Sequence, residues 1–98
     1  MLPEIIYEVN LEGKVTYANQ RGLSIFGYSK EDLETGLTIQ KLFPENYLQM
    51  INNLKELTTP DQTASNEYLA TKKDGTKFPI ITHSFATFFG DKIISYRG

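Results

Sequence analysis

The chain has 98 residues, of which 40% are hydrophobic, and its 10 Lys and Arg against 12 Asp and Glu give a formal net charge of −2. This length and composition predict one folded domain with a small core and exclude a chain that is disordered by composition. The weak negative charge argues against nucleic acid as the main partner, because phosphate binding requires a basic surface.

The sequence contains no cysteine. This excludes disulfides, thiolate metal sites and cysteine nucleophiles. No run of about 18 apolar residues predicts a membrane span, and the first residues lack the basic and apolar segments of a signal peptide. We therefore expect a cytoplasmic domain that makes no membrane contact itself.

The first third of the chain predicts a β-hairpin. Residues 5–10 and 14–17 alternate apolar and polar side chains, and a period of two is typical of strands. Gly13 lies between the two runs, where a tight turn needs a residue that tolerates a positive φ. The alternation places Tyr7 and Val9 on one face of the first strand.

Residues 18–58 lack such alternation and predict helices. A short helix over residues 18–26 is expected to end at Gly27. A second short helix is expected to begin at a segment that resembles a capping box, in which Ser29 accepts a backbone N–H three residues on and Asp32 favours the positive end of the helix.

A third short helix is predicted over residues 39–43, and a longer one follows. Pro44 is expected in the first turn of the longer helix, where its missing N–H costs no hydrogen bond. Pro60 blocks continuation of that helix. Its apolar stripe has the spacing i, i+3, i+4, i+7 and consists of Tyr47, Met50, Ile51 and Leu54.

The last third returns to strands, predicted over residues 66–73, 76–88 and 92–97. The sequence Asp74-Gly75 between the first two of these runs is a strong hairpin signal. Strands at both ends of the chain with helices between them predict an α+β fold, in which helices cover one face of an antiparallel sheet.

Motifs of catalysis are absent from the sequence. His83 is the single histidine, so no site with two histidine ligands can form. The glycines occur singly and form neither a dinucleotide-binding motif nor a P-loop. We therefore do not expect this domain to be an enzyme.

Three segments resemble the motifs of one known family, the PAS (Per-Arnt-Sim) domains. Residues 10–19, NLEGKVTYAN, are similar to its D-x-x-G-x-I-x-Y-x-N motif, with Asn10 in place of the usual Asp. Residues 26–33, FGYSKEDL, are similar to G-Y-S/T-x-E-D/E-L. Residues 72–79, KKDGTKFP, are similar to R/K-R/K-D-G-S/T-x-F-P/W. The three motifs occur in order, and the resemblance covers nearly the whole chain.

The resemblance implies a five-stranded antiparallel sheet with three to four helices packed on one face. It implies that residues 1–98 form a single PAS domain, a fragment of a longer bacterial or archaeal signalling protein. The function it implies is sensory: the domain binds a small molecule or forms a homodimer, and so controls an attached output domain such as a histidine kinase in a two-component system. The alternative is a ligand-free module for protein–protein interaction and dimerisation.

The resemblance also limits the cofactor, whose identity stays open. Covalent flavin and photoactive-yellow-type chromophores attach to a Cys, which this chain lacks. Relatives that bind haem commonly supply a His from the long helix, and residues 44–57 contain none, so haem is not expected. A non-covalent flavin has no residue signature here.

The expected ligand site of the family lies between the sheet and the long helix. The residues predicted to line it are Met50, Leu54, Tyr68, Ile80, Thr82 and Ser84. Two of these, Thr82 and Ser84, place hydroxyls where a core strand favours Val or Leu. Each hydroxyl either contacts a polar ligand or bonds nearby backbone or water.

The same alternation places Ile81, His83 and Phe85 on the outer face of the sheet, where an apolar strip commonly marks an interface. For His83 the alternatives are an exposed residue without a role, a pH-sensing residue of the interface, and, least favoured, a haem ligand. Asn19 is expected to cap a helix rather than contact a ligand. The remaining core residues expected are Tyr17, Phe26, Leu42, Phe43 and Ile51.

Overall fold

The computed structural model describes residues 4–98. Its strands form a 5-stranded antiparallel sheet in the order β2-β1-β5-β4-β3. The elements, in chain order, are β1 (Tyr7–Asn10), β2 (Val15–Ala18), α1 (Gln20–Phe26), α2 (Lys30–Gly36), α3 (Ile39–Leu42), α4 (Tyr47–Lys55), β3 (Ala64–Thr71), β4 (Lys77–Phe89) and β5 (Lys92–Arg97). The predicted α+β architecture is confirmed.

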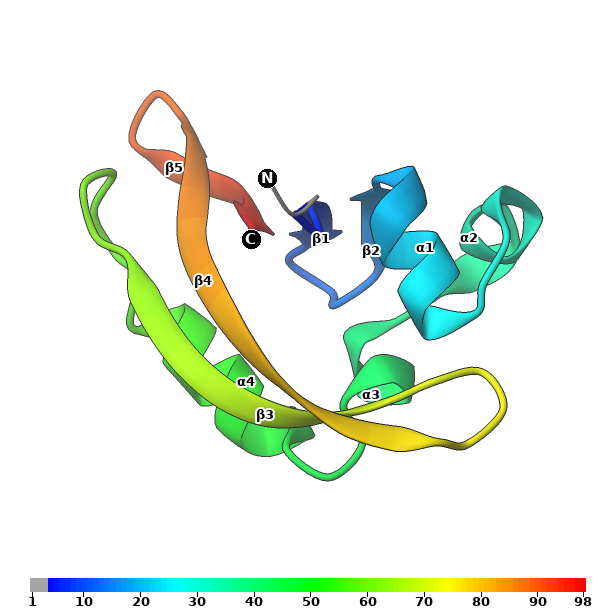
Figure 1. Cartoon of the computed structure of the whole chain (residues 1–98). Helices are drawn as coiled ribbons and strands as arrows, with labels where there is room; N and C mark the ends of the chain where they lie inside the picture. Colours follow the sequence, from blue (N-terminus) through cyan, green and yellow to red (C-terminus); the bar gives the residue numbers. More distant parts are fainter. Residues whose placement is uncertain (1–3) are drawn as a thin grey trace.

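The sheet brings the first and last strands together. β1 lies between β2 and β5, while β3 and β4 form a long curved hairpin on the other side of β5 (Figure 1). The helices follow one another along the side of the sheet that holds the core, with α1 and α2 near β2 and α4 near β3 (Figure 1). No helix within residues 4–98 has the length and apolar character needed to cross a bilayer.

The turn between β1 and β2 forms as predicted. The side-chain oxygen of Asn10 accepts the backbone N–H groups of Glu12 and Lys14, at 3.0 and 2.9 Å. Gly13 has a φ of 85°, a left-handed conformation that few other residues adopt without strain. Asn10 therefore supplies the acceptor that the usual Asp of the motif would supply.

The prediction that Tyr17 lies in the core is wrong. Thr16 is an extra residue opposite the Glu8–Val9 step, because Val9 pairs with Val15 while Glu8 pairs with Tyr17. Such a β-bulge reverses the alternation beyond it. Tyr17 consequently lies on the outer face, 51% exposed, whereas simple alternation places it in the core with Val15.

The position of Pro44 also differs from the prediction. Helix α4 begins only at Tyr47, and Pro44 lies in the turn before it. This turn closes through a hydrogen bond from the Asn46 N–H to the Phe43 carbonyl at 3.2 Å. Proline fits the second position of such a turn because its φ is already fixed there. The Asn46 side chain accepts the Leu69 N–H of β3 at 2.8 Å, which ties the helix start to the sheet edge.

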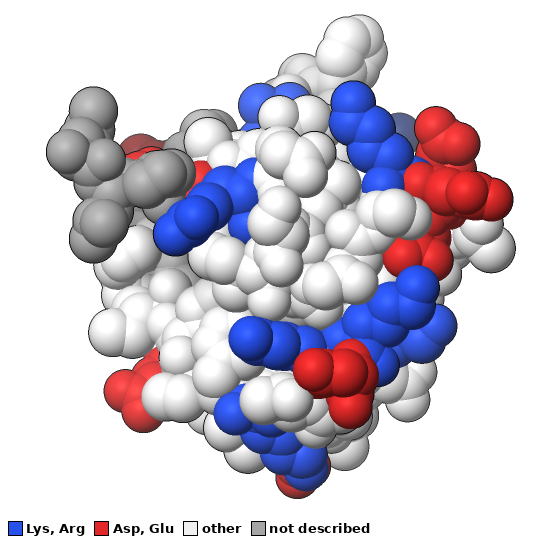
Figure 2. All heavy atoms as spheres, turned by 45° about the vertical axis from the view of Figure 1, so that its right-hand side comes forward, with Lys and Arg blue, Asp and Glu red and all other residues white. Residues whose placement is uncertain are grey.

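The predicted capping box of α2 is present and is linked to the β3–β4 turn. Ser29 Oγ accepts the Asp32 N–H at 3.1 Å, and Asp32 Oδ2 accepts the Ser29 N–H at 2.9 Å. Lys73 Nζ lies 3.0 Å from Asp32 Oδ2. The Ser29 backbone N–H and then the Lys73 ammonium lower the pKa of Asp32 to about 2. On the face that carries α1 and α2, basic and acidic side chains lie side by side (Figure 2).

Aromatic rings connect the helices to the sheet. Phe26 of α1 packs edge-to-face against Phe43 and Phe78, with ring centroids 6.1 and 5.3 Å apart, and Phe43 packs in the same way against Tyr68 of β3 at 5.9 Å. Edge-to-face packing aligns the positive ring edge with a negative ring face. The predicted core residues other than Tyr17 are buried or, for Ile51, half-buried.

Asn19 joins the N-terminal segment to α1, and it caps the helix as predicted. Its side-chain oxygen accepts the N–H groups of Gly22 and Ile6, both at 3.0 Å. Its amide nitrogen donates to the Glu4 carbonyl at 2.6 Å. One side chain thus satisfies three backbone groups on two segments.

We expect Asn19→Ala to lower the free energy of unfolding by about 1–2 kcal/mol, because helix-cap removal alone costs about 1 kcal/mol and two further backbone groups lose their partner. Urea unfolding monitored by circular dichroism measures this. Gln20→Ala, an exposed change in the same turn, is the control and should change stability by less than about 0.5 kcal/mol. Equal effects of the two variants would contradict the role assigned to Asn19.

Candidate ligand-binding site

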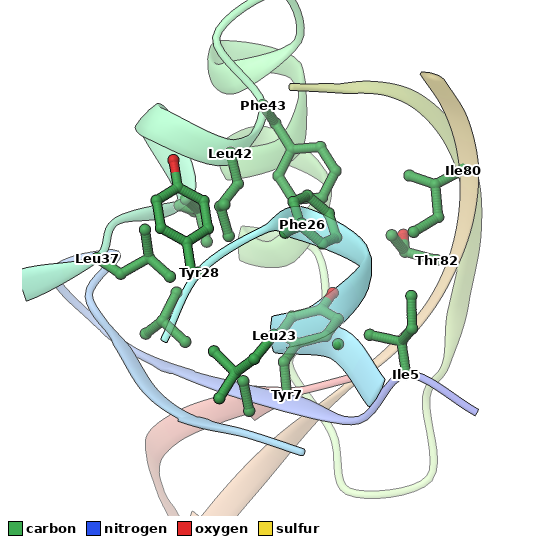
Figure 3. Close-up of a pocket in the computed structure, with 14 residues that line it drawn as sticks. Ile5, Tyr7, Leu23, Phe26, Tyr28, Leu37, Leu42, Phe43, Ile80 and Thr82 are labelled. Carbon is green, nitrogen blue, oxygen red and sulfur yellow. The ribbon is translucent and has the colours of Figure 1, made fainter. Parts of the chain in front are cut away.

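An internal cavity of about 40 Å³ lies between the inner face of the sheet and helices α1 and α3 (Figure 3). The strands β1, β2 and β4 contribute to its walls. The residues that line it are Ile5, Tyr7, Val15, Ala18, Gly22, Leu23, Phe26, Tyr28, Leu37, Ile39, Leu42, Phe43, Ile80 and Thr82.

None of the residues within 4–98 that line this cavity has a charged side chain. Of the described residues that line it, Thr82, Tyr7 and Tyr28 carry hydroxyl groups, and the surface that faces the cavity is apolar. In Figure 3 the Tyr28 hydroxyl points away from Tyr7, so the interior is formed by aliphatic groups, ring faces and two hydroxyl-bearing residues. Such a surface suits an apolar molecule with few polar groups.

Thr82 is the unusual residue of the cavity wall. It is only 5% exposed, and its Oγ1 atom has no hydrogen-bond partner within residues 4–98. A buried hydroxyl without a partner costs free energy, about 1–3 kcal/mol by protein mutational data. Thr82 and Ile80 point from β4 toward the cavity (Figure 3).

Ser84, two residues further along β4, is equally buried but does not line the cavity. Its Oγ lies 3.5 Å from the Tyr7 hydroxyl, at the outer limit of a hydrogen bond. Burial raises the pKa of the Tyr7 phenol, which therefore stays neutral at physiological pH. The contact leaves the Tyr7 hydroxyl with unused hydrogen-bonding capacity.

Tyr7 also connects the cavity to the end of β5. Its backbone exchanges two hydrogen bonds with Gly98, at 3.0 and 3.1 Å. A Cβ atom on Gly98 would lie 2.7 Å from atoms of the Tyr7 ring, closer than real contacts allow. The space that a side chain at this position would occupy is therefore filled by the ring that forms the cavity wall.

The structure brings only part of the predicted ligand set together. Ile80 and Thr82 line the cavity. Met50, Leu54 and Tyr68 are buried but are not among its lining residues. The Tyr68 hydroxyl accepts a hydrogen bond from the Asn53 side chain of α4 at 2.7 Å, so its polar end already has a partner. The cavity lies beside α1 and α3 rather than beside the long helix.

The lining residues from α1, α3 and the first strand were not proposed from the sequence. The sequence does indicate that Tyr7 faces inward, because the alternation of the first strand places it on the same face as Val9. For Leu23, Leu37 and Ile39 the signal is only an apolar side chain in or beside a short helix, which does not distinguish a cavity wall from filled core.

The outer face of β4 has the exposure pattern that the alternation predicts. Ile81 is 61% exposed and Phe85 42% exposed. His83 lies between them, and its Nδ1 is 2.8 Å from the hydroxyl of Ser65 on β3. Residues 4–98 contain no group of three His, Cys, Asp or Glu side chains that could hold a metal ion.

Comparison with known proteins identifies the family. The family model described as "PAS domain" matches residues 3–98, and the chain therefore belongs to the PAS domain family. No curated protein sequence matches the chain.

Solved structures share the fold at low sequence identity. The PAS domain of a Colwellia psychrerythraea protein has a TM-score of 0.82 at 18% identity, covering 95% of this chain and 80% of that chain. Drosophila melanogaster Cycle PAS-B with bound ethylene glycol has a TM-score of 0.79 at 16% identity, covering 96% and 94%. A PAS domain from a two-component sensor histidine kinase has a TM-score of 0.78 at 13% identity, covering 96% and 80%.

Thr82→Val tests the energetic state of the cavity hydroxyl. The substitution keeps the shape of the side chain and removes an unpartnered polar atom, so we expect the free energy of unfolding to rise by about 1 kcal/mol. Urea unfolding of the ligand-free domain measures it. Ser84→Ala, which removes a hydroxyl that has a contact, should not stabilise. A Thr82→Val domain less stable than the parent would mean that Thr82 Oγ1 has a partner in solution.

Proposed function

We propose that this PAS domain is a sensory input module that binds a small molecule in the cavity and controls an output domain attached to the same chain. The observation that carries the proposal is the unpartnered, buried Thr82 hydroxyl at the wall of an apolar cavity. A ligand that bonds this hydroxyl would recover the free energy that its burial costs.

The small volume of the cavity restricts how a ligand enters. Ligand pockets commonly have volumes from about 300 Å³, so a molecule of that size must displace part of the wall. Ile5 and Tyr28 are two of the half-buried wall residues and lie in the chain on either side of α1, and we propose that they move when a ligand enters.

The route from the cavity to the attached domain runs through Tyr7. A ligand that moves the Tyr7 ring changes the contact with Gly98, which the β1–β5 pairing holds against it. Such a change becomes a signal only when the ligand binds one arrangement of the sheet more tightly than another. The histidine kinase relative illustrates the type of protein in which we place this domain, and we propose that residues 1–98 form the single PAS domain of a longer protein.

Native mass spectrometry of the purified domain, followed by NMR, tests this function. We expect extra mass that is lost on denaturation, and a ligand-dependent shift of the Gly98 amide. Gly75 and Gly90, at hairpin tips with no atoms within 4 Å of an added Cβ, are the internal reference and should not shift. A domain that carries no ligand and takes up none from a metabolite extract would contradict the sensory function.

The second candidate function is dimerisation through the outer face of the sheet. The exposed apolar side chains Ile81 and Phe85, with His83 between them, favour it, because an apolar strip on a sheet face is costly to leave in water. The same strip suits a homodimer, since a two-fold axis brings a face against its own copy.

We expect Phe85→Glu to convert a dimer into a monomer, with the apparent mass in analytical ultracentrifugation reduced by half. Leu48→Glu is the matched control, because Leu48 is a 75% exposed apolar residue on α4, away from the strip. This control should leave the mass unchanged. A monomeric parent domain, or a Phe85→Glu variant that stays dimeric, would contradict an interface at this face.

A further inference from the structure

We infer that the cavity takes an uncharged, largely apolar molecule with one hydrogen-bonding group, and that Thr82 binds this group. The inference rests on the proposed function, since it names the class of ligand that the same cavity accepts. It follows from three properties of the walls: their lack of charged residues, the position of the unpartnered hydroxyl, and the half-buried residues that can move outward.

The walls exclude an ion. None of the lining residues is charged, and none is a His, Asn or Gln that could solvate a charge. A carboxylate or an ammonium group buried there would lose its hydration without gaining a counter-charge, at a cost that a few hydroxyl contacts cannot offset. Organic acids, amines and phosphate-bearing cofactors are therefore poor ligands for this cavity.

Among the lining residues that the structure describes, Thr82 and Tyr7 have hydroxyls with unused hydrogen-bonding capacity. Thr82 Oγ1 has no partner, and the neighbouring Tyr7 hydroxyl has only the long contact with Ser84. In Figure 3 the Tyr7 hydroxyl points toward the side of the cavity on which Thr82 lies, while the Tyr28 hydroxyl points away from Tyr7. A ligand with a single hydroxyl or carbonyl can use this side, and a molecule with several polar groups would leave most of them unpartnered.

The remaining surface selects for hydrocarbon. Leu23, Leu42 and Phe43 present aliphatic groups and a ring to the cavity (Figure 3). Apolar cavities of this type stay dry and accept small rings when they are large enough. The cavity of about 40 Å³ is smaller than a ring, so binding requires wall residues to move outward, and the half-buried Ile5 and Tyr28 are the candidates for this movement.

Three single-ring probes separate these properties: phenol and toluene, which match in size, and benzoate, which carries a charge. Binding is followed at pH 7 by NMR titration of the isotope-labelled chain, read at the amides of Tyr7 and Thr82. We expect phenol to bind about five-fold more tightly than toluene, which corresponds to one net hydrogen bond. Benzoate should not shift these amides.

A matched pair of variants assigns the hydrogen bond to Thr82. Thr82→Val should abolish the preference for phenol over toluene. Thr87→Val makes the same change on the same strand, at another buried hydroxyl without a partner, but Thr87 does not line the cavity. This control should keep the preference.

The outcomes separate the ligand class from the function. Benzoate binding at the cavity amides would overturn the ligand class and leave the proposed function standing. A phenol preference that survives Thr82→Val would overturn the role of Thr82. If no probe shifts the cavity amides, the ligand class is overturned, and the native mass spectrum then decides whether the function fails as well.

Discussion

Strand β4 contributes residues both to the cavity and to the candidate dimer interface. The alternation of its side chains determines which residues face the cavity side and which face outward. Thr82 and Ser84 point to the core, while Ile81, His83 and Phe85 point outward. The register that fixes this alternation is set by the Asp74-Gly75 turn and by eight paired positions between β3 and β4, from Ala64↔Ser84 to Thr71↔Lys77. A slip of one residue would expose the hydroxyls and bury the apolar strip. Both the cavity and the candidate dimer interface therefore depend on the register of this hairpin.

The sequence allowed the elements to be predicted wherever a local signal determines the backbone. Asn10 and Gly13 define a turn, Ser29 and Asp32 define a helix start, and both occur as expected. The prediction for Tyr17 failed because the pairing of two strands, rather than the alternation within one strand, determines which face its side chain occupies. The bulge at Thr16, which turns Tyr17 outward, has no signature of its own in the chain.

The position of the cavity could not be read from the sequence for a related reason. An apolar residue in a short helix fills core or lines a cavity according to how well its neighbours meet across the fold, and this is a property of tertiary packing. The sequence does indicate the polar part of the site, because a Thr on the core face of a strand departs from the usual aliphatic choice. The sequence therefore predicts Thr82 as a residue of the site, but it does not predict Leu37 or Ile39.

The contact between Gly98 and Tyr7 has a consequence for the direction of control. Coupling between two sites is reciprocal in free energy. If a ligand that moves Tyr7 also moves Gly98, then anything that displaces Gly98 from the Tyr7 ring changes the affinity of the cavity for that ligand in turn. If the cavity binds a ligand as proposed, tension on the end of β5 would therefore change the ligand concentration at which the cavity fills.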